Sequence, residues 1–442
     1  MSEAVAQSPA LWRQLQAGAI VLAAIRAGSS GTAALEAVPG ALKPGVQALV
    51  YAALRELGRA EALRKLLAPR KPSPEVDALL CLALALAWQD EGAPYEAHTL
   101  VNQAVEAAKR GSSTRAQAGF VNACLRRFLR ERPALVAQTD TDPVARWNHP
   151  RWWIERLQRE VPDHWQAILQ ANNRQAPMTL RVNIRKTTVA AFQARLQEAG
   201  IAAWRNGEQG LTLAAPLPVQ QIPGFAQGLV SVQDGAAQLA APLLLRGLEH
   251  QPGLRVLDAC AAPGGKTAHL LELSAAEVTA LDIDPLRCQR ITDNLARLGL
   301  QARVQAADAG RPEAWWDGRP FDAILLDAPC TASGIVRRHP DVRWLRRESD
   351  VAQLAAQQAR LLQTLWPLLK PGGRLLYCTC SVFRAEGEEQ VQAFLAHNTR
   401  ARLLPSPGHL WPTLGRKADA VTDNQFSDHD GFYYALLEKG AG

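Results

Sequence analysis

Apolar residues recur at intervals of three and four positions through the first third of the chain, which is the pattern of helices that bury one face. One such stripe runs from Val46 to Leu57, and another runs from Phe120 to Leu129. The pattern extends from Leu11 to about Arg132. We therefore predict an all-helical unit for this part of the chain.

The pattern changes after Gly253, where short apolar runs alternate with helical stretches. Such alternation favours an α/β fold built on a doubly wound, parallel-rich sheet. The predicted strands are 254–258, 277–282, 302–306, 321–327 and 374–380. Ligands of these sheets bind beyond the carboxyl ends of the strands, so we expect Asp258, Asp282, Asp327 and Cys380 to share one edge.

A polar segment ending at Pro143 separates the helical part from the rest of the chain, which is typical of a linker. Beyond it, helical signals lead into a short mixed region in which 179–183 and 210–213 resemble strands and 189–199 resembles a helix. We predict three parts: an all-helical domain at 8–138, linker helices with a small α+β module at 144–230, and an α/β domain at 231–440.

Composition narrows the class of protein. Hydrophobic residues make up 48% of the 442 residues, which is enough for a globular protein with ample core. The formal net charge of +7 favours a polyanionic partner such as nucleic acid, although a merely basic enzyme stays open. Seven cysteines without framework spacing argue against disulfides. The sequence has neither a secretory leader nor a long apolar run, so we expect a cytoplasmic protein without a membrane span.

The run Asp258-Ala-Cys-Ala-Ala-Pro-Gly-Gly-Lys-Thr267 follows the first predicted strand of the α/β part and leads into a helix. Its paired glycines, Gly264 and Gly265, allow the backbone to approach a ligand closely at the helix start. A phosphate loop would need a glycine where Cys260 stands, and the spaced glycines of a dinucleotide site are absent. The pattern therefore disfavours an ATPase and a dinucleotide enzyme.

Acidic residues at the ends of the next strands suit a different ligand. Asp282 is placed to bind ribose hydroxyls, and Asp308 could receive an adenine amino group. A nucleoside ligand without phosphates is favoured.

Two cysteine motifs carry the candidate chemistry. Cys330 closes the run Asp327-Ala-Pro-Cys330, and Cys380 lies in Cys378-Thr-Cys-Ser381. Neither has the spacing of a zinc site, and no metal is implied. A carboxylate and thiols on neighbouring strand ends suit covalent catalysis on a ring. We expect only one of Cys378 and Cys380 to face the site, with Cys378 turned away. The expected core cysteines are Cys81, Cys124 and Cys288.

The catalytic-half motifs together resemble the NOL1/NOP2/Sun family of S-adenosylmethionine-dependent RNA 5-methylcytosine methyltransferases. The helical half, with Phe120-Val-Asn-Ala-Cys-Leu-Arg-Arg127, is similar to a NusB-type RNA-binding domain. The resemblance covers nearly the whole chain. The motifs that carry it are 258–267, Asp327-Ala-Pro-Cys330, Arg337-Arg-His-Pro-Asp341, Thr379-Cys-Ser381 and Asp430-Gly-Phe432.

The resemblance implies a Rossmann-like methyltransferase domain that binds S-adenosyl-L-methionine and modifies small-subunit (16S) rRNA. It implies Cys380 as the nucleophile that adds to carbon 6 of cytosine, Cys330 as the residue that promotes product release, and Asp327 as the group beside the pyrimidine edge. It leaves Cys378 as an extra thiol outside the motif. The implied cofactor-binding residues are Cys260, Ala261, Ala262, Pro263, Gly264, Gly265, Lys266, Asp282, Asp308 and Asp327.

Basic residues suggest where RNA would bind. Arginines between Arg126 and Arg132 give the last helix of the helical part a positive face, for which RNA binding and a solvated surface are equally plausible. The segment 335–347 interleaves cations with Trp344, and we expect it to hold phosphates beside the target and to stack a base. Lys266 has two candidate roles, electrostatic assistance and anchoring of a helix start.

Three alternatives stay open. A tRNA methyltransferase would share the active-site motifs, since substrate choice depends on the auxiliary domains. A DNA cytosine methyltransferase would use Cys330 as its nucleophile. A non-catalytic RNA-binding assembly factor would be expected to have lost a nucleophile or a cofactor carboxylate, and none is missing. We expect a monomer with no obligate protein partner.

Overall fold

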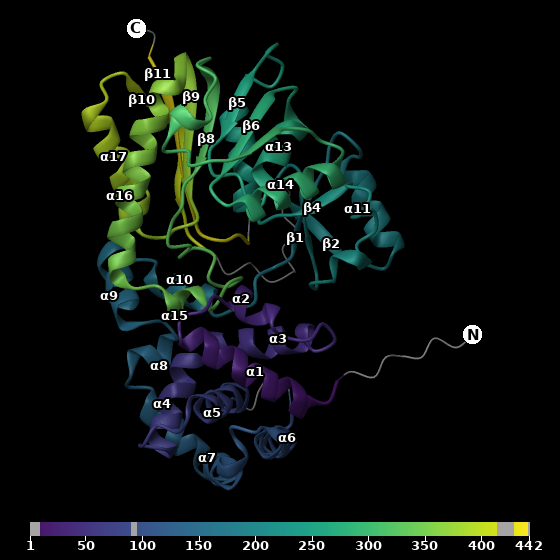
Figure 1. Cartoon of the computed structure of the whole chain (residues 1–442), viewed down its shortest axis with the longest axis vertical. Helices are drawn as coiled ribbons and strands as arrows, with labels where there is room; N and C mark the ends of the chain where they lie inside the picture. The colour runs from purple at the N-terminus through teal and green to yellow at the C-terminus, as the bar shows by residue number, and fades with distance from the viewer. Residues whose placement is uncertain (1–8, 90–94, 413–427, 441–442) are drawn as a thin grey trace. The chain divides into compact units, whose positions relative to one another are not determined.

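The computed structural model describes residues 9–89, 95–412 and 428–440, and the chain divides into two compact units (Figure 1). Unit 1 contains the chain up to Arg174 together with 336–346. Unit 2 contains 175–335 and the chain from Arg347 onward. The polypeptide therefore leaves unit 2 after Ile335, contributes eleven residues to unit 1, and returns at Arg347.

Unit 1 is helical throughout its described residues, as the apolar stripes predict. Its centre is α5, in which every residue from Val76 to Ala87 is buried. Helices α1, α3, α4 and α6 pack around α5 and supply the apolar faces that it needs. The α-helices are α1 (Leu11–Arg26), α2 (Gly31–Glu36), α3 (Lys43–Arg55), α4 (Leu57–Leu67), α5 (Pro74–Ala87), α6 (Ala97–Arg110), α7 (Ala118–Thr139), α8 (Pro143–Trp147), α9 (Arg151–Glu160), α10 (Trp165–Asn172) and α15 (Val342–Leu345).

The predicted linker is a short turn between α7 and α8. The Arg59 guanidinium on α4 lies 2.6 Å from Asp140 and donates to the Thr139 hydroxyl at 2.6 Å. The division into three domains with boundaries at 138, 144 and 230 stays a prediction. The two compact units divide the chain at different residues.

Unit 2 begins with a four-stranded antiparallel sheet in the order β2-β3-β1-β4. Helix α11 (Val189–Glu198) packs on it through Phe192 and Leu196. Two of the strands and the helix match the predicted α+β module, and β2 and β4 are additions. The strands are β1 (Thr179–Val182), β2 (Ala203–Asn206), β3 (Gly210–Leu213) and β4 (Val230–Val232).

The larger sheet of unit 2 has the order β10-β11-β9-β8-β5-β6-β7, with the five strands from β9 to β7 parallel. The expected strands are all present, with β9 beginning earlier than predicted. Strands β10 and β11 add an antiparallel edge. The bounds are β5 (Arg255–Asp258), β6 (Glu277–Asp282), β7 (Arg303–Ala306), β8 (Phe321–Asp327), β9 (Leu369–Thr379), β10 (Ala401–Leu410) and β11 (Phe432–Lys439).

Helices cover both faces of this sheet (Figure 1). On one face, α12 (Ala240–Leu245), α13 (Gly265–Leu273) and α14 (Pro285–Leu298) bury apolar side chains with Leu376 and Cys378 of β9. On the other face, α16 (Glu348–Leu365) and α17 (Glu388–His397) pack with Leu375 and Tyr377. The alternation along β9 follows from the two-residue period of a strand. The doubly wound, parallel-rich α/β class is confirmed.

Candidate active site

The loop between β5 and α13 is shaped by Gly264, which caps α13 with a φ of +93°. A Cβ at this position would lie 3.2 Å from the Ile291 Cα, and the positive φ would strain any residue that carries one. The Gly264 amide donates to the Ala261 carbonyl at 2.7 Å. The loop therefore presents its backbone at the amino terminus of α13, as the motif 258–267 predicts.

Asp258 ends β5 and is fully buried. Its Oδ2 accepts a hydrogen bond from the Thr267 hydroxyl at 2.7 Å, whereas Oδ1 has no partner among the described residues. Burial raises the pKa of this carboxyl to about 7; the Thr267 hydrogen bond lowers it, and the nearby Asp327 charge raises it further. A buried carboxylate oxygen without a partner is costly, so this atom fits a polar ligand group.

The carboxylates after β6 and β7 lie along the same edge, because β5, β6 and β7 are adjacent parallel strands. Asp282 accepts hydrogen bonds from the Ala262 amide at 3.3 Å and the Asp284 amide at 3.1 Å. Asp308 accepts one from the Gly310 amide at 2.8 Å. The loop of β5 and both acidic residues are thus arranged as a nucleoside site requires.

Asp327 at the end of β8 pairs with Lys266 at the start of α13. The Lys266 Nζ lies 2.6 Å from the Asp327 Oδ2 and 5.3 Å from the centroid of the Phe432 ring. Burial of Lys266 lowers its pKa, but the Asp327 carboxylate outweighs burial and the pKa is raised. Lys266 is therefore a cation at the carboxyl ends of the strands, in contact with the carboxylate of Asp327.

The two predicted reactive thiols meet beside this pair. The Sγ atoms of Cys330 and Cys380 are 3.3 Å apart, and both side chains are half-buried. The hydrogen bond to Cys380 raises the pKa of Cys330 well above its usual value, and burial and the charges of Cys380 and Glu386 add to the rise. The two sulfurs are close enough together to act on adjacent atoms of one small ring.

The expectation that Cys378 turns away from the site is wrong. Cys380 follows the last residue of β9, and its side chain packs against the same apolar cluster that contains Cys378. The Cys378 Sγ donates to the Asp327 Oδ1 at 3.5 Å, and burial raises the pKa of Cys378, as does the Asp327 charge. Cys378 is thus a buried neutral partner of Asp327. The expected core cysteines Cys81, Cys124 and Cys288 are buried as predicted.

Three residues that the sequence analysis does not identify, Thr331, Ser333 and Glu386, hold the two thiol loops together with Ser381. Glu386 is fully buried and accepts hydrogen bonds from Thr331, which follows Cys330, and from Ser381, which follows Cys380. The Ser333 hydroxyl lies 2.9 Å from the Ser381 hydroxyl. The sequence offers little signal for Glu386, because it stands in a polar run beside Glu388 and Glu389 that is typical of an exposed helix start.

The segment 335–347 differs from its prediction. Arg337 and Arg343 are buried in unit 1, so the expectation that they hold phosphates is wrong. The Arg343 guanidinium donates to the Asn148 carbonyl at 3.1 Å and the Asn172 carbonyl at 2.6 Å. The Trp344 indole N–H donates to the Leu54 carbonyl at 2.8 Å, which occupies the group expected to stack a base. The buried part of the segment is structural.

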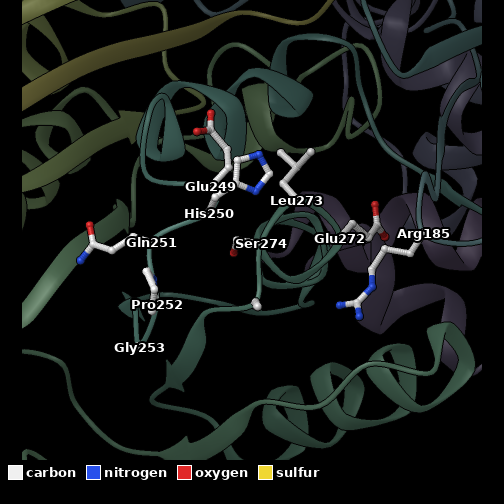
Figure 2. Close-up of a pocket in the computed structure, with 10 residues that line it drawn as sticks. Arg185, Glu249, His250, Gln251, Pro252, Gly253, Glu272, Leu273 and Ser274 are labelled. Atoms are coloured by element: carbon white, nitrogen blue, oxygen red, sulfur yellow. The ribbon is translucent and has the colours of Figure 1, made fainter.

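A surface pocket of unit 2 lies at the opposite edge of the large sheet from these groups. It is bounded by the loop 249–253, which precedes β5, and by residues 272–275, at and beyond the end of α13. In Figure 2, Glu249 and His250 lie on one side of this pocket and Arg185 on another. Ligands of parallel sheets bind at the carboxyl edge, so the topology does not favour this pocket as the cofactor site.

Membrane spans and metal clusters are both absent from the described part of the chain. Within residues 9–89, 95–412 and 428–440, no helix is long and apolar enough to cross a membrane. No group of three or more potential metal ligands occurs in the same residues.

Comparison with known proteins agrees with the fold. Residues 245–438 match the model of the 16S rRNA methyltransferase RsmB/F family. Residues 149–220 match the ferredoxin-like domain of RsmF/B-like methyltransferases. Residues 18–130 match the NusB family, so the NusB-like nature of the helical part is confirmed.

Relatives and a solved structure extend the match over nearly the whole chain. The Ribosomal RNA small subunit methyltransferase B of Vibrio cholerae is 42% identical over 420 residues, covering 93% of this chain and 94% of that protein. The Pseudomonas putida protein of the same name is 47% identical over 349 residues, 78% of each chain. The crystal structure of PH0851 is 27% identical with a TM-score of 0.76, covering 96% of this chain and 99% of that one. The chain belongs to the 16S rRNA methyltransferase RsmB/F family.

Proposed function

We propose that this protein transfers a methyl group from S-adenosyl-L-methionine to carbon 5 of a cytosine in small-subunit (16S) rRNA, through a covalent adduct between Cys380 and carbon 6. The observation that carries the proposal is the 3.3 Å approach of the Cys330 and Cys380 sulfurs beside the Asp327–Lys266 pair. The names of the relatives support rRNA as the substrate class.

The cofactor is held by residues at the carboxyl edge of the sheet. The loop 260–266 would hold it at the start of α13, with Asp282 at its ribose and Asp308 at its adenine. The unpartnered Oδ1 of buried Asp258 fits such a group. When bound, S-adenosyl-L-methionine supplies an electrophilic methyl group.

Cytosine needs a nucleophile because its carbon 5 is too weakly nucleophilic to take a methyl group unaided. The Cys380 thiolate would add to carbon 6 and so place electron density on carbon 5. Carbon 5 would then take the methyl group as the bond between that methyl group and the sulfonium sulfur breaks, which leaves the cofactor as a neutral thioether. The carboxylate of Asp327 and the ammonium of Lys266 are 2.6 Å apart, and we assign to this pair the stabilisation of the charge that develops at N3 of the ring.

Release of the product is the task of Cys330. It takes the proton from carbon 5, the freed electron pair restores the ring double bond, and the bond from carbon 6 to the Cys380 sulfur breaks. In the free protein, Cys380 is the largest cause of the raised pKa of Cys330. Once the Cys380 sulfur is bonded to carbon 6 it is no longer a charged neighbour, so Cys330 loses its proton more readily at the stage where a base is needed.

The helical unit supplies a basic surface for the RNA. On α7, Arg126, Arg127 and Arg130 are exposed, whereas Arg132 is half-buried and donates to the Ala87 carbonyl. Exposed arginines on one helix suit phosphate contacts, which hold RNA without reading its sequence.

The roles of the two thiols are tested by trapping. Cys380→Ala is expected to form no covalent adduct with RNA containing 5-fluorocytosine, because carbon 6 lacks its attacking group. Cys330→Ala is expected to accumulate a protein–RNA adduct with unmodified RNA, because elimination is blocked. Denaturing gels reveal both outcomes. Cys124→Ala, which alters a thiol on α7 of unit 1, serves as the control and should behave as the unaltered protein. The reverse pattern would assign attack to Cys330, as in a DNA cytosine methyltransferase.

Substrate choice requires a separate experiment. Transfer of labelled methyl groups to purified rRNA and tRNA should favour rRNA, and labelling of tRNA alone would refute the rRNA assignment. Bisulfite sequencing of cells with and without the protein would identify the cytosine.

Absence of S-adenosyl-L-methionine binding in calorimetry would favour a non-catalytic assembly factor instead.

A further inference from the structure

Glu386 is a buried carboxylate that contacts both thiol-bearing loops of unit 2. It lies in a short 3-10 turn after β9, at residues 384–386, and its side chain is fully buried. Its Oε1 accepts hydrogen bonds from the Thr331 amide at 2.8 Å and the Gln358 side-chain amide at 3.2 Å. Its Oε2 accepts from the hydroxyls of Thr331 and Ser381, the latter at 2.6 Å. All four donors are uncharged.

These contacts place one carboxylate between the immediate neighbours of the two sulfurs. Thr331 follows Cys330, and Ser381 follows Cys380. The same two loops are joined by the Val382 amide, which donates to the Ser333 hydroxyl at 2.9 Å, and by the Gly334 amide, which donates to the Cys380 carbonyl at 2.9 Å. Loop 330–334 is therefore fixed against 380–382 on both sides of Glu386.

The backbone of Glu386 is itself fixed to β9. Its carbonyl accepts hydrogen bonds from the Tyr377 hydroxyl at 2.8 Å and the Thr379 hydroxyl at 3.1 Å. A carboxylate buried among neutral donors carries a desolvation cost that simple packing does not require, since a neutral side chain could fill the space. We therefore look for a role that needs both the charge of Glu386 and its hydrogen bonds.

We propose that Glu386 is a positioning residue for methyl transfer, which holds the loop of Cys330 against the loop of Cys380 and so sets the approach of the two sulfurs. The proposal rests on the thiol roles of the proposed function. Geometry needed for covalent attack and for proton removal from adjacent ring carbons tolerates little displacement, because a shift of about 1 Å can cost on the order of a hundredfold in rate.

The negative charge of Glu386 has a second effect. It is one of the groups that raise the pKa of Cys330, after the contact with Cys380 and burial. A base with a higher pKa is stronger once it has lost its proton. Glu386 thereby favours a protonated Cys330 in the free protein and a stronger base during release.

Two substitutions in the full-length protein separate geometry from charge. Glu386→Ala removes every side-chain contact, and we expect kcat for methyl transfer to fall by about a hundredfold with the KM for RNA little changed. Glu386→Gln keeps an acceptor and a hydrogen-bonding shape without the charge. For it we expect kcat within about tenfold of the unaltered protein and a lower pH midpoint for decay of the covalent adduct, measured by quenching on denaturing gels.

Matched controls make the outcome decisive. Glu389→Ala, an exposed glutamate three residues along the chain, should leave kcat and the pH midpoint unchanged. If Glu386→Ala fails to fold, the pair Thr331→Val with Ser381→Ala removes both hydroxyl donors and should lower kcat instead. Full kcat in a folded Glu386→Ala protein, or in that pair, would overturn the proposal, as would an unshifted pH midpoint for Glu386→Gln.

The same gels distinguish failure of the proposed function. If Cys330→Ala accumulates no adduct with RNA, the assignment of the two thiols is wrong. The role proposed for Glu386, which depends on that assignment, is then wrong as well. If Cys330→Ala accumulates adduct while the Glu386 variants behave as the unaltered protein, only the role of Glu386 is wrong.

Discussion

Asp258 is a buried carboxyl whose pKa differs strongly from its usual value. Its carboxyl is buried at the end of β5, and its only hydrogen bond among the described residues comes from Thr267. Burial favours the neutral acid and raises its pKa from 3.8 to about 7. The folded protein therefore keeps a proton on Asp258 that the unfolded chain has already lost at mildly acidic pH.

The sign of the resulting pH dependence follows from proton linkage. Between pH 4 and 7 the unfolded state binds fewer protons at this site than the folded state, so the free energy of unfolding falls as pH rises. Asp258→Asn removes the titration. We expect the free energy of unfolding of the unaltered protein to decline by about 3 kcal/mol more than that of the variant between pH 5 and 8.

Urea unfolding of both proteins at pH 5, 6, 7 and 8 provides the measurement, and the difference between the two curves isolates Asp258 from other titrating groups. Thr267 can still donate to the asparagine carbonyl, so the packing is retained. Parallel curves would mean that Asp258 is ionised in the folded protein throughout this range.

At the scale of elements, the small sheet of unit 2 is tied to the helix after the cofactor loop. Arg181 on β1 and Glu272 on α13 are both buried, and the guanidinium donates to both carboxylate oxygens at 2.9 Å. Arg181 also donates to the Gly265 carbonyl at 2.8 Å. The ion pair therefore connects β1 to both ends of α13.

Arg181→Met leaves the buried Glu272 carboxylate without its cation. We expect a loss of about 3–5 kcal/mol in the free energy of unfolding, because an unpaired buried charge is costly. We also expect weaker S-adenosyl-L-methionine binding, since Gly265 loses the contact that steadies its carbonyl. Chemical unfolding and calorimetry measure the two effects.

The double variant Arg181→Met with Glu272→Leu tests the cause. Replacing both charges with apolar groups removes the unpaired carboxylate, so most of the lost stability should return. The contact with Gly265 stays absent, so the cofactor affinity should stay low. A double variant no more stable than Arg181→Met would show that packing, and not charge, accounts for the loss.

The elements also show what the sequence could and could not predict. Most of the parallel strands were predictable because they are short apolar runs separated by helical stretches, whereas β7 is short and partly exposed. Strand β10 was hidden by Pro405 and Pro407, which an edge strand tolerates and which coincide with the register shift between Leu404 and Gly408. Contacts such as that of Glu386 with Thr331 join residues 55 positions apart, and no local pattern reveals them.

The positions of the thiols could be predicted only in part from the sequence. The motifs 327–330 and 378–381 identified the right loops, and the sulfurs of Cys330 and Cys380 do meet. The orientation of Cys378 depends on the pairing of β9 with β8, which sets Cys378 beside Asp327 and which the sequence does not show. The burial of Arg343 was not predictable, because a buried guanidinium bound to backbone carbonyls looks like any exposed arginine in sequence.

At the scale of the whole molecule, the segment 336–346 belongs to unit 1 although it comes shortly after Cys330 in the chain. Asp341 accepts a hydrogen bond from the Gly31 amide at 2.8 Å, and the Arg337 carbonyl accepts one from Arg55 at 2.8 Å. With the contacts of Arg343 and Trp344, these bonds give the segment its fixed conformation. The partners in these bonds all come from the first 174 residues.

A fragment that begins at residue 175 therefore lacks every one of those partners. Arg337 and Arg343, 2% and 0% exposed in the full chain, should become accessible, and we expect trypsin to cleave after arginines in 337–346 at least about tenfold faster than in the full-length protein. Timed digestion with mass mapping of the products measures this.

Arg374 in β9 provides the internal control, because its strand lies wholly in unit 2 and its cleavage should be equally slow in both proteins. Slow cleavage at both places in the fragment would mean that the segment holds its conformation without unit 1, whereas rapid cleavage at Arg374 as well would mean that unit 2 requires unit 1 to fold.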